Sequence, residues 1–217
     1  MSQFTWVHIT FLLQGALWTI ALTLVAVLGG GLLGFGVALA RIAKNPLLRY
    51  GALVYVQVMQ GTPLLILMFL TYFGFTMLGA KQLPALVATG LSMTLYAAAF
   101  LGEIWRGAIE AVPKTQWEAA ECIGLTGWQR LVKVVLPQAM RLATPPTVGF
   151  LVQIVKNTSL ASVVGYVELA QAGRLVNNST FQPFIAYLLV AALYFALCYP
   201  LSAWSRRLER RLHVGRR

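Results

Sequence analysis

The chain contains no aspartate, and it has only two histidines and two cysteines among its 217 residues. A serine–histidine–aspartate triad is therefore impossible, and a membrane-embedded enzyme would need a nucleophile or metal cluster that these residues do not supply. The P-loop sequence G-x-x-x-x-G-K-S/T is absent as well, so we expect no ATP hydrolysis through such a loop. These absences predict a protein without catalytic residues of its own.

Charged residues are also scarce, because they make up 11% of the chain whereas 59% of it is hydrophobic. This balance is typical of a membrane protein, and the length fits one domain, residues 1–217. A hydrocarbon core about 30 Å thick needs roughly 20 apolar residues per helix, and helices satisfy their own backbone hydrogen bonds. The sequence therefore predicts an all-α membrane protein with five transmembrane helices. The five stretches are Leu12–Ala40, Leu53–Leu78, Ala85–Trp105, Leu142–Val164 and Phe184–Trp204.

The basic residues are distributed unevenly around these stretches. Fourteen of the 17 lie in or beside the first loop, the loop between the third and fourth spans, and the C-terminal tail. Lys81 and Arg174 lie on the other side, and Lys156 lies inside the fourth span. The positive-inside bias then places the N-terminus outside and the C-terminus in the cytosol. Because membrane topology explains the net charge of +11, we do not expect nucleic-acid binding.

This topology separates the few residues that could form a metal site or a disulfide. His8 and His213 are expected on opposite sides of the membrane, so no metal site is predicted. Cys122 is expected in the cytosolic loop and Cys198 in the last span, so the two should not pair. No lysine or arginine precedes Arg41, so the first span is not expected to be a cleaved signal peptide.

A polar loop, residues 106–141, separates the third and fourth spans. Thr115 and Glu118 have the Thr-x-x-Glu spacing of a capping box, which predicts a helix that starts after Thr115. Gly124 can adopt the positive φ that ends such a helix about two turns later. A stiff, short helix is therefore expected outside the lipid.

A second helix is expected directly after this glycine. Thr126 and Gln129 repeat the capping pattern, and the helix should run to about Leu136, where Pro137 interrupts it. Two short helices around a glycine turn offer a docking surface for a soluble partner. The alternative is that the loop folds back on the membrane surface, but its polar side chains interrupt the apolar face that such a helix needs.

The same loop carries a recognisable pattern: Glu118-Ala119-Ala120, three residues, Gly124, nine residues, and then Val134-Val135-Leu136-Pro137. It resembles the coupling loop of permease subunits of ATP-binding-cassette importers, whose pattern ends in Ile-x-Leu-Pro, and it departs from that pattern only at Val134. From about Gln57 to Arg211 the chain is similar to the polar amino acid branch, which comprises histidine, glutamine, arginine and opine permeases. The further stretches that carry this similarity are residues 61–65, 103–107, 113–118 and 156–160.

The resemblance implies the type I importer permease fold in the inner membrane, with a second permease subunit, either the same or related. It also implies a dimer of cytosolic ATPase subunits, which would hold ATP and Mg²⁺, and an extracytoplasmic substrate-binding protein. In the family the short loop helix docks into a groove on the ATPase. Small alanines let a partner approach closely. The implied ATPase-coupling residues are Thr115, Glu118, Ala119, Ala120 and Gly124.

Lys156 is the one charged residue deep in the fourth span, and a charge inside a span is a functional hypothesis. Its ammonium group is suited to the α-carboxylate of a bound amino acid, and Asn157, Thr158 and Ser159 add polar partners. The resemblance supports this, since the family's corresponding stretch contributes to its transmembrane binding site. The alternative is that Lys156 snorkels to the outer interface.

The second span contains a polar stretch, Gln60, Gly61, Thr62 and Pro63, within an apolar run. Gly61 weakens a helix and Pro63 lacks an amide proton, so the backbone is expected to open there. Transporters often build midplane substrate sites from such openings, although a packing kink is the alternative. Many relatives have arginine where Gln60 stands. If that arginine binds the substrate carboxylate in relatives, either Lys156 contributes more to carboxylate binding here or the ligand is held differently.

Small and polar residues also recur at helical spacing along two spans. In the first span, Gly30 and Gly34 form G-x-x-x-G, which favours close helix packing over a dinucleotide-binding glycine loop. The small residues of the stripe in the third span favour helix packing, and Ser92 and Tyr96 are also candidate cavity residues. Glu103 is expected to pair with Arg106. The stripe in the third span consists of Thr89, Ser92, Tyr96, Ala99 and Glu103.

Taken together, these features predict a transport subunit that moves a polar L-amino acid inward by alternating access and performs no bond chemistry itself. Partner ATPase subunits would drive it through the loop helix. The alternative is a self-sufficient secondary carrier or channel. Such a protein needs buried acidic residues for proton or sodium coupling, and Glu103 alone comes near this requirement.

Overall fold

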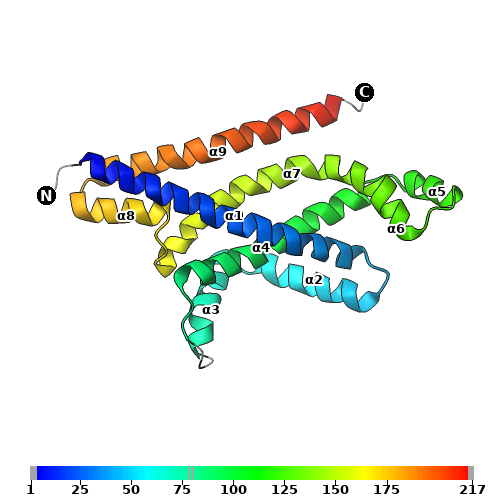
Figure 1. Cartoon of the computed structure of the whole chain (residues 1–217), viewed down its shortest axis with the longest axis horizontal. Helices are drawn as coiled ribbons and strands as arrows, with labels where there is room; N and C mark the ends of the chain where they lie inside the picture. The colour runs from blue at the N-terminus through cyan, green and yellow to red at the C-terminus, as the bar shows by residue number, and fades with distance from the viewer. Residues whose placement is uncertain (1–3, 78, 80, 215–217) are drawn as a thin grey trace.

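The computed structural model describes residues 4–77, 79 and 81–214, and the regular structure in this part of the chain is entirely helical. Figure 1 shows long helices along one axis, with α8 near the N-terminus and α5 and α6 at the far end. The elements are α1 (Trp6–Ile42), α2 (Pro46–Gly61), α3 (Leu64–Met77), α4 (Ala85–Glu110), α5 (Lys114–Cys122), α6 (Gly127–Arg130), η1 (Leu131–Val135), α7 (Leu136–Asn157), η2 (Thr158–Val164), α8 (Leu169–Thr180) and α9 (Pro183–Val214).

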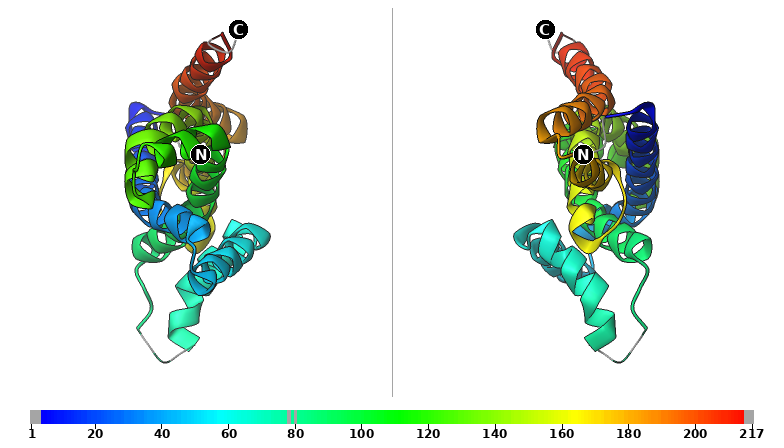
Figure 2. Two further views of the ribbon diagram at one scale, coloured as in Figure 1. Left: turned by 90° about the vertical axis from the view of Figure 1, so that its right-hand side faces the viewer. Right: turned by 90° about the vertical axis from the view of Figure 1, so that its left-hand side faces the viewer.

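Four helical runs among the described residues are long and apolar enough to cross a membrane: α1, α4, Gly127–Val164 and α9. The predicted second span, Leu53–Leu78, is not one straight helix, because α2 and α3 are bent by 102° at a short break; the described residues contain five spans if this bent pair is counted as one. Thr62 is extended, with φ −106° and ψ 129°, as expected for a residue before proline. The predicted opening at Pro63 is confirmed, and Figure 2 shows the α2–α3 arm projecting from the bundle.

Small residues let α1 and α4 approach each other closely. A Cβ added at Gly30 would lie 2.5 Å from the Cβ of Ala97, closer than real Cβ atoms come. A Cβ at Gly34 would lie 3.0 Å from the carbonyl oxygen of Ala98. The predicted packing role of Gly30 and Gly34 is confirmed, since only a missing side chain lets the two backbones approach this closely.

Replacing Gly30 by leucine is therefore expected to destabilise the bundle. Overpacking of a tight contact costs about 1–3 kcal/mol, which corresponds to a drop of roughly 2–12 °C in the unfolding midpoint of a chain this size. Gly36→Leu on the same helix is the control, because a Cβ there meets nothing within 4 Å. Thermal unfolding in detergent measures both variants, and equal midpoints for the two would contradict the packing account.

The segment after the glycine turn is continuous with the next span, which corrects the predicted break at Pro137. The run Gly127–Val164 is helical over 38 residues. The helix accommodates Pro137 by a π turn at Leu131–Val135, in which the amide of Leu136 donates to the carbonyl of Leu131. A proline ring crowds the carbonyl four residues earlier, here that of Lys133, and the wider turn gives it room.

A buried glutamate organises the opposite end of the bundle, and the sequence analysis missed it. Glu168 is 0% exposed and caps α8 through the amides of Ala170 and Gln171, at 3.0 and 2.9 Å. Its carboxylate also accepts the hydroxyls of Thr19 at 3.3 Å and Tyr194 at 2.6 Å. With four donors, the carboxylate joins α1, α8 and α9 and stabilises their packing.

Candidate functional site

The α5–α6 hairpin, residues 114–130, protrudes from the far end of the bundle (Figure 1). Its first helix begins at Lys114, two residues before the predicted start, so Thr115 lies inside the helix and the predicted capping box with Glu118 is wrong. The N-cap is Pro113, with φ −54°. A proline has no amide proton to satisfy and its fixed φ suits a helix start, so no threonine cap is needed.

The predicted glycine turn and second cap of the hairpin are confirmed. Gly124 has φ +79°, and the amide of Leu125 donates to the carbonyl of Ala120 at 3.2 Å, which ends α5. Thr126 and Gln129 form a reciprocal capping box, with N···O distances of 3.0 and 3.4 Å. A backbone hydrogen bond thus holds one end of the turn, and two hydrogen bonds from backbone amides to side-chain oxygens hold the other.

Not all of the implied ATPase-coupling residues on α5 are open to a partner. Glu118 and Ala119 are exposed, whereas Ala120 is 3% exposed because α5 packs against η1. Of the two small residues, only Ala119 is open to a partner. An ion pair between Glu121 and Arg130 joins the two helices of the hairpin.

The hairpin is attached to the bundle by an apolar cluster. Leu131 and Val135 of η1 pack with Val112, which precedes α5, and with residues of α4 and α7. Trp117 of α5 lies against the same cluster. This packing makes the hairpin a stiff extension of α4 and α7.

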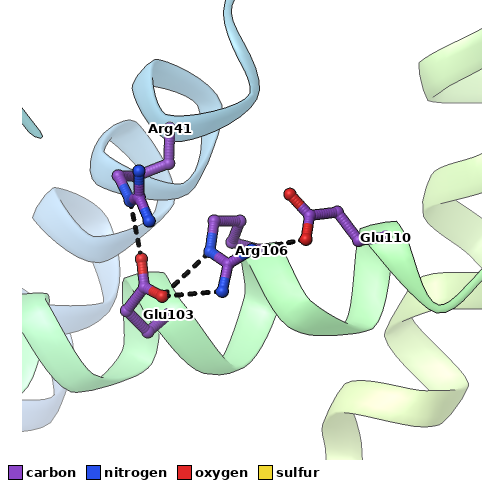
Figure 3. A network of polar contacts seen from close by, with 4 residues as sticks. All are labelled: Arg41, Glu103, Arg106 and Glu110. Carbon is purple, nitrogen blue, oxygen red and sulfur yellow. Dashed lines mark hydrogen bonds and ion pairs between the residues drawn. The ribbon is translucent and has the colours of Figure 1, made fainter. Parts of the chain in front are cut away.

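An ion-pair network lies beside this attachment, as Figure 3 shows. Glu103 accepts from Arg106 at 2.8 Å, which confirms the predicted pair within α4. Glu103 also accepts from Nε of Arg41 at 2.8 Å, so the network ties α1 to α4, and Arg106 continues it to Glu110. The side chains of Arg41, Glu103 and Arg106 are only 14–23% exposed, so solvent screens this network less than it screens a surface ion pair.

The polar stretch around Lys156 lies where α7 passes into η2. Lys156 is exposed and forms no ion pair with the carboxylates of the described residues. Thr158 is 0% exposed, and its hydroxyl donates to the carbonyl of Val155 at 2.8 Å. Asn157 and Ser159 are half-buried, and the Ser159 hydroxyl donates to the carbonyl of Lys156 at 2.7 Å. The side-chain oxygen of Asn157 already accepts from Nε2 of Gln153 at 3.0 Å, so the lysine ammonium is the open group of this stretch.

The two candidate cavity residues of α4 differ in their surroundings. Ser92 is 1% exposed, and its hydroxyl donates to the carbonyls of Ala88 and Thr89 at 3.0 and 3.1 Å. It is therefore a packing residue, closed to a ligand in this structure. Tyr96 is half-buried and its hydroxyl faces the Asn157 side chain. Tyr96 of α4 and Asn157 of α7 thus form a polar contact between the two helices.

The opened stretch of the α2–α3 arm lies near the same region. Gln60, Gly61 and Pro63 are exposed and Thr62 is half-buried. The next residue, Leu64, packs in the core cluster that also contains Ala161 of η2. No hydrogen bond joins the Gln60–Pro63 stretch to the Lys156 stretch within the described residues. The two stretches border one cluster without forming one site in the single subunit.

Comparisons with known proteins give a consistent result. Residues 30–214 match the family model for the binding-protein-dependent transport system inner membrane component. The chain is 34% identical to the "Probable amino-acid ABC transporter permease protein YckA" of Bacillus subtilis (strain 168), over 93% of this chain and 88% of that protein. It is 36% identical to the "L-cystine transport system permease protein TcyB" of the same organism, over 91% and 85%. A crystal structure of an amino acid ABC transporter with histidines has a TM-score of 0.87 at 28% identity, covering 97% of this chain and 100% of that one.

Proposed function

This chain belongs to the family of binding-protein-dependent transport system inner membrane components, and from this membership we propose that it is the permease subunit of an ATP-driven importer of a polar L-amino acid. The membership confirms the resemblance predicted from the loop motif. The chain is a multi-pass inner-membrane protein. We assign the substrate class from relatives named for amino-acid and L-cystine transport.

The basic end of the bundle is proposed to face the cytosol. This end contains the α1–α2 turn, the end of α4 and the α5–α6 hairpin, where most of the basic residues between Arg41 and Arg141 lie. The positive-inside bias supports this orientation. The hairpin would then meet a cytosolic ATPase dimer that holds ATP and Mg²⁺, and the opposite end would meet an extracytoplasmic substrate-binding protein.

The observation that carries the proposal is the continuous helix from the hairpin to the polar stretch. The run Gly127–Val164 begins in the hairpin and contains Lys156, Asn157 and Thr158 near its other end. At 1.5 Å per residue, Gly127 and Lys156 are roughly 40 Å apart along one stiff element. Movement of the hairpin by an ATPase would therefore reach the Lys156 stretch directly and could reorient it between outward and inward states.

A second permease subunit, identical or related, is proposed to cover the open polar groups. Gln60 and Lys156 are exposed in the single subunit although they lie within otherwise apolar segments. Polar side chains at membrane depth are costly when they face lipid and normally face protein or a wet cavity. A partner subunit over these groups would enclose a cavity in which the ammonium of Lys156 meets the substrate carboxylate.

The alternative function, a self-sufficient carrier or channel, needs an acidic group that can exchange protons or sodium. Glu168 is the buried carboxylate that this alternative would require. Two hydroxyls and two amides already donate to it, so it caps α8 and links this helix to α1 and α9. We therefore favour the ATP-driven importer.

Docking of the hairpin on the ATPase can be tested with the native cysteines. Cys122 is exposed on α5 and Cys198 is buried, so a bulky maleimide should label Cys122 selectively. Addition of the partner ATPase subunits is expected to slow this labelling at least tenfold, because docking covers α5. Labelling rates are read by gel shift on the purified complex and on the chain alone.

The matched control places a cysteine at the opposite end of the same protein. Thr10→Cys in a Cys122→Ser background puts an exposed thiol on α1 near the N-terminus. Its labelling rate should not change when the ATPase is added. Unchanged labelling of Cys122 in an assembled complex would exclude docking through α5.

A further inference from the structure

A large cavity opens at the basic end, between the α1–α2 turn, the end of α4 and the α5–α6 hairpin. Figure 2 (left) looks onto this end of the bundle. The cavity volume is about 1170 Å³, which exceeds the ~300–1,000 Å³ of a typical small-molecule site. Six cationic side chains line it together with Glu110: Arg41, Lys44, Arg49, Arg106, Lys114 and Arg130.

Half of these cations have no carboxylate partner. Lys44, Arg49 and Lys114 form no ion pair in the part of the chain that the structure describes. The other three cations share three glutamates: Arg41 with Glu103, Arg106 with Glu103 and Glu110, and Arg130 with Glu121. Even when Glu103 and Glu121, which do not line the cavity, are counted with Glu110, the six cations exceed their carboxylate partners by three, and this uncompensated charge favours an anion.

Part of the cavity wall is apolar. Leu39, Ile42, Leu53 and Ile109 line it from α1, α2 and α4. Aromatic residues line the cavity as well, among them Trp128, which is 64% exposed; the others are Tyr50 and Trp117. Exposed tryptophan and tyrosine beside lysine and arginine are typical of the membrane–water interface. The cavity is thus amphipathic, because cationic side chains and a hydrocarbon-like wall line it together.

We propose that this cavity binds an anionic phospholipid, with the phosphate among Lys44, Arg49 and Lys114 and an acyl chain along the apolar wall. Basic pockets between transmembrane helices bind the headgroups of anionic lipids in this way. Inorganic phosphate would neutralise the cations but leave the apolar wall unfilled. Because the bundle forms one side of the cavity and the hairpin the other, the bound lipid joins the hairpin to the bundle. The site depends neither on the substrate nor on ATP.

The test compares lipid binding by the full chain and by two triple variants. In the first, Lys44→Gln, Arg49→Gln and Lys114→Gln remove the unpaired cations, which are exposed and therefore dispensable for folding. In the control, Arg206→Gln, Arg207→Gln and Arg210→Gln remove the same charge from exposed positions of α9 that do not line the cavity. Each protein is titrated in detergent with dioleoyl phosphatidylglycerol or dioleoyl phosphatidylcholine, and bound lipid is counted by native mass spectrometry.

The natural chain and the α9 control should retain phosphatidylglycerol in preference to phosphatidylcholine. The cavity variant should bind phosphatidylglycerol roughly 100-fold more weakly, given the attraction that each basic residue contributes near an anionic headgroup. Equal phosphatidylglycerol binding by the two triple variants would overturn the site. Displacement of the lipid by 10 mM inorganic phosphate would also overturn the proposal, because it would identify a soluble phosphate as the ligand.

Discussion

Uptake by the assembled transporter is expected to fall roughly 100-fold when Ala119 is replaced by arginine. Ala119 is exposed on α5, and arginine is a good helix former, so the chain should fold and insert normally. A long side chain at the centre of the proposed docking surface would keep the ATPase groove from closing on α5. Losses of this size are typical when a central interface contact fails. Uptake of labelled amino acids into proteoliposomes measures the effect.

The control at this position is Ala119→Ser, which keeps the side chain small and should retain uptake near the natural level. ATP hydrolysis by the complex should continue in Ala119→Arg but lose its stimulation by the substrate-loaded binding protein. This combination identifies uncoupling and excludes loss of the ATPase. Full uptake by Ala119→Arg would show that the ATPase grips another surface.

The second large effect is expected from Lys156→Ala, which removes the ammonium from the polar stretch at the end of α7. If this group binds the substrate carboxylate, uptake should fall roughly 100-fold or more, the loss expected when one partner of a desolvated charge pair is removed. The complex should still assemble and hydrolyse ATP. Uptake is measured per molecule of complex in the membrane, so that altered insertion does not enter the result.

Two variants separate substrate binding from membrane anchoring at this position. Lys156→Arg keeps a cation and should retain part of the uptake. Lys133→Ala removes an exposed lysine from the other end of the same helical run and should leave uptake unchanged. If Lys156→Ala lowers only the amount of inserted protein and leaves uptake per molecule intact, Lys156 acts as a snorkelling anchor.

Local signals predicted several elements well. Long apolar runs identified α1, α4 and α9, because span length follows from bilayer thickness. The turn at Gly124 and the cap at Thr126 were predictable, since both depend on residues within one turn of the chain. The loop motif that contains them also identified the family.

Other predictions failed where local rules competed or where burial depended on distant residues. Pro113, and not Thr115, is the N-cap of α5. A π turn accommodates Pro137, and the helix continues through it with Val135 packed in the apolar cluster. Hydropathy could not reveal the 102° bend at Thr62, since both arms are apolar. Helical spacing placed Ser92 on a stripe of small and polar residues but did not show that its hydroxyl is closed to a ligand.

Glu168 shows what sequence reasoning could not supply. It lies in a short polar segment, where a glutamate is ordinarily exposed. Its burial arises from Thr19, 149 residues away, and Tyr194, 26 residues away. The sequence does offer one signal, because Glu168 directly precedes Leu169, where an amphipathic helix starts. This position indicates an N-cap, but it does not show that the carboxylate is buried and joins three helices.

The central claim is that cytosolic ATPase subunits drive this bundle through the α5–α6 hairpin. The most direct measurement is amino acid accumulation in proteoliposomes that contain either the permease chains alone or the complete complex, with the binding protein outside and ATP inside. Accumulation against a gradient should occur only with the complete complex and ATP. Accumulation by the permease chains alone would contradict the account and would favour the self-sufficient carrier.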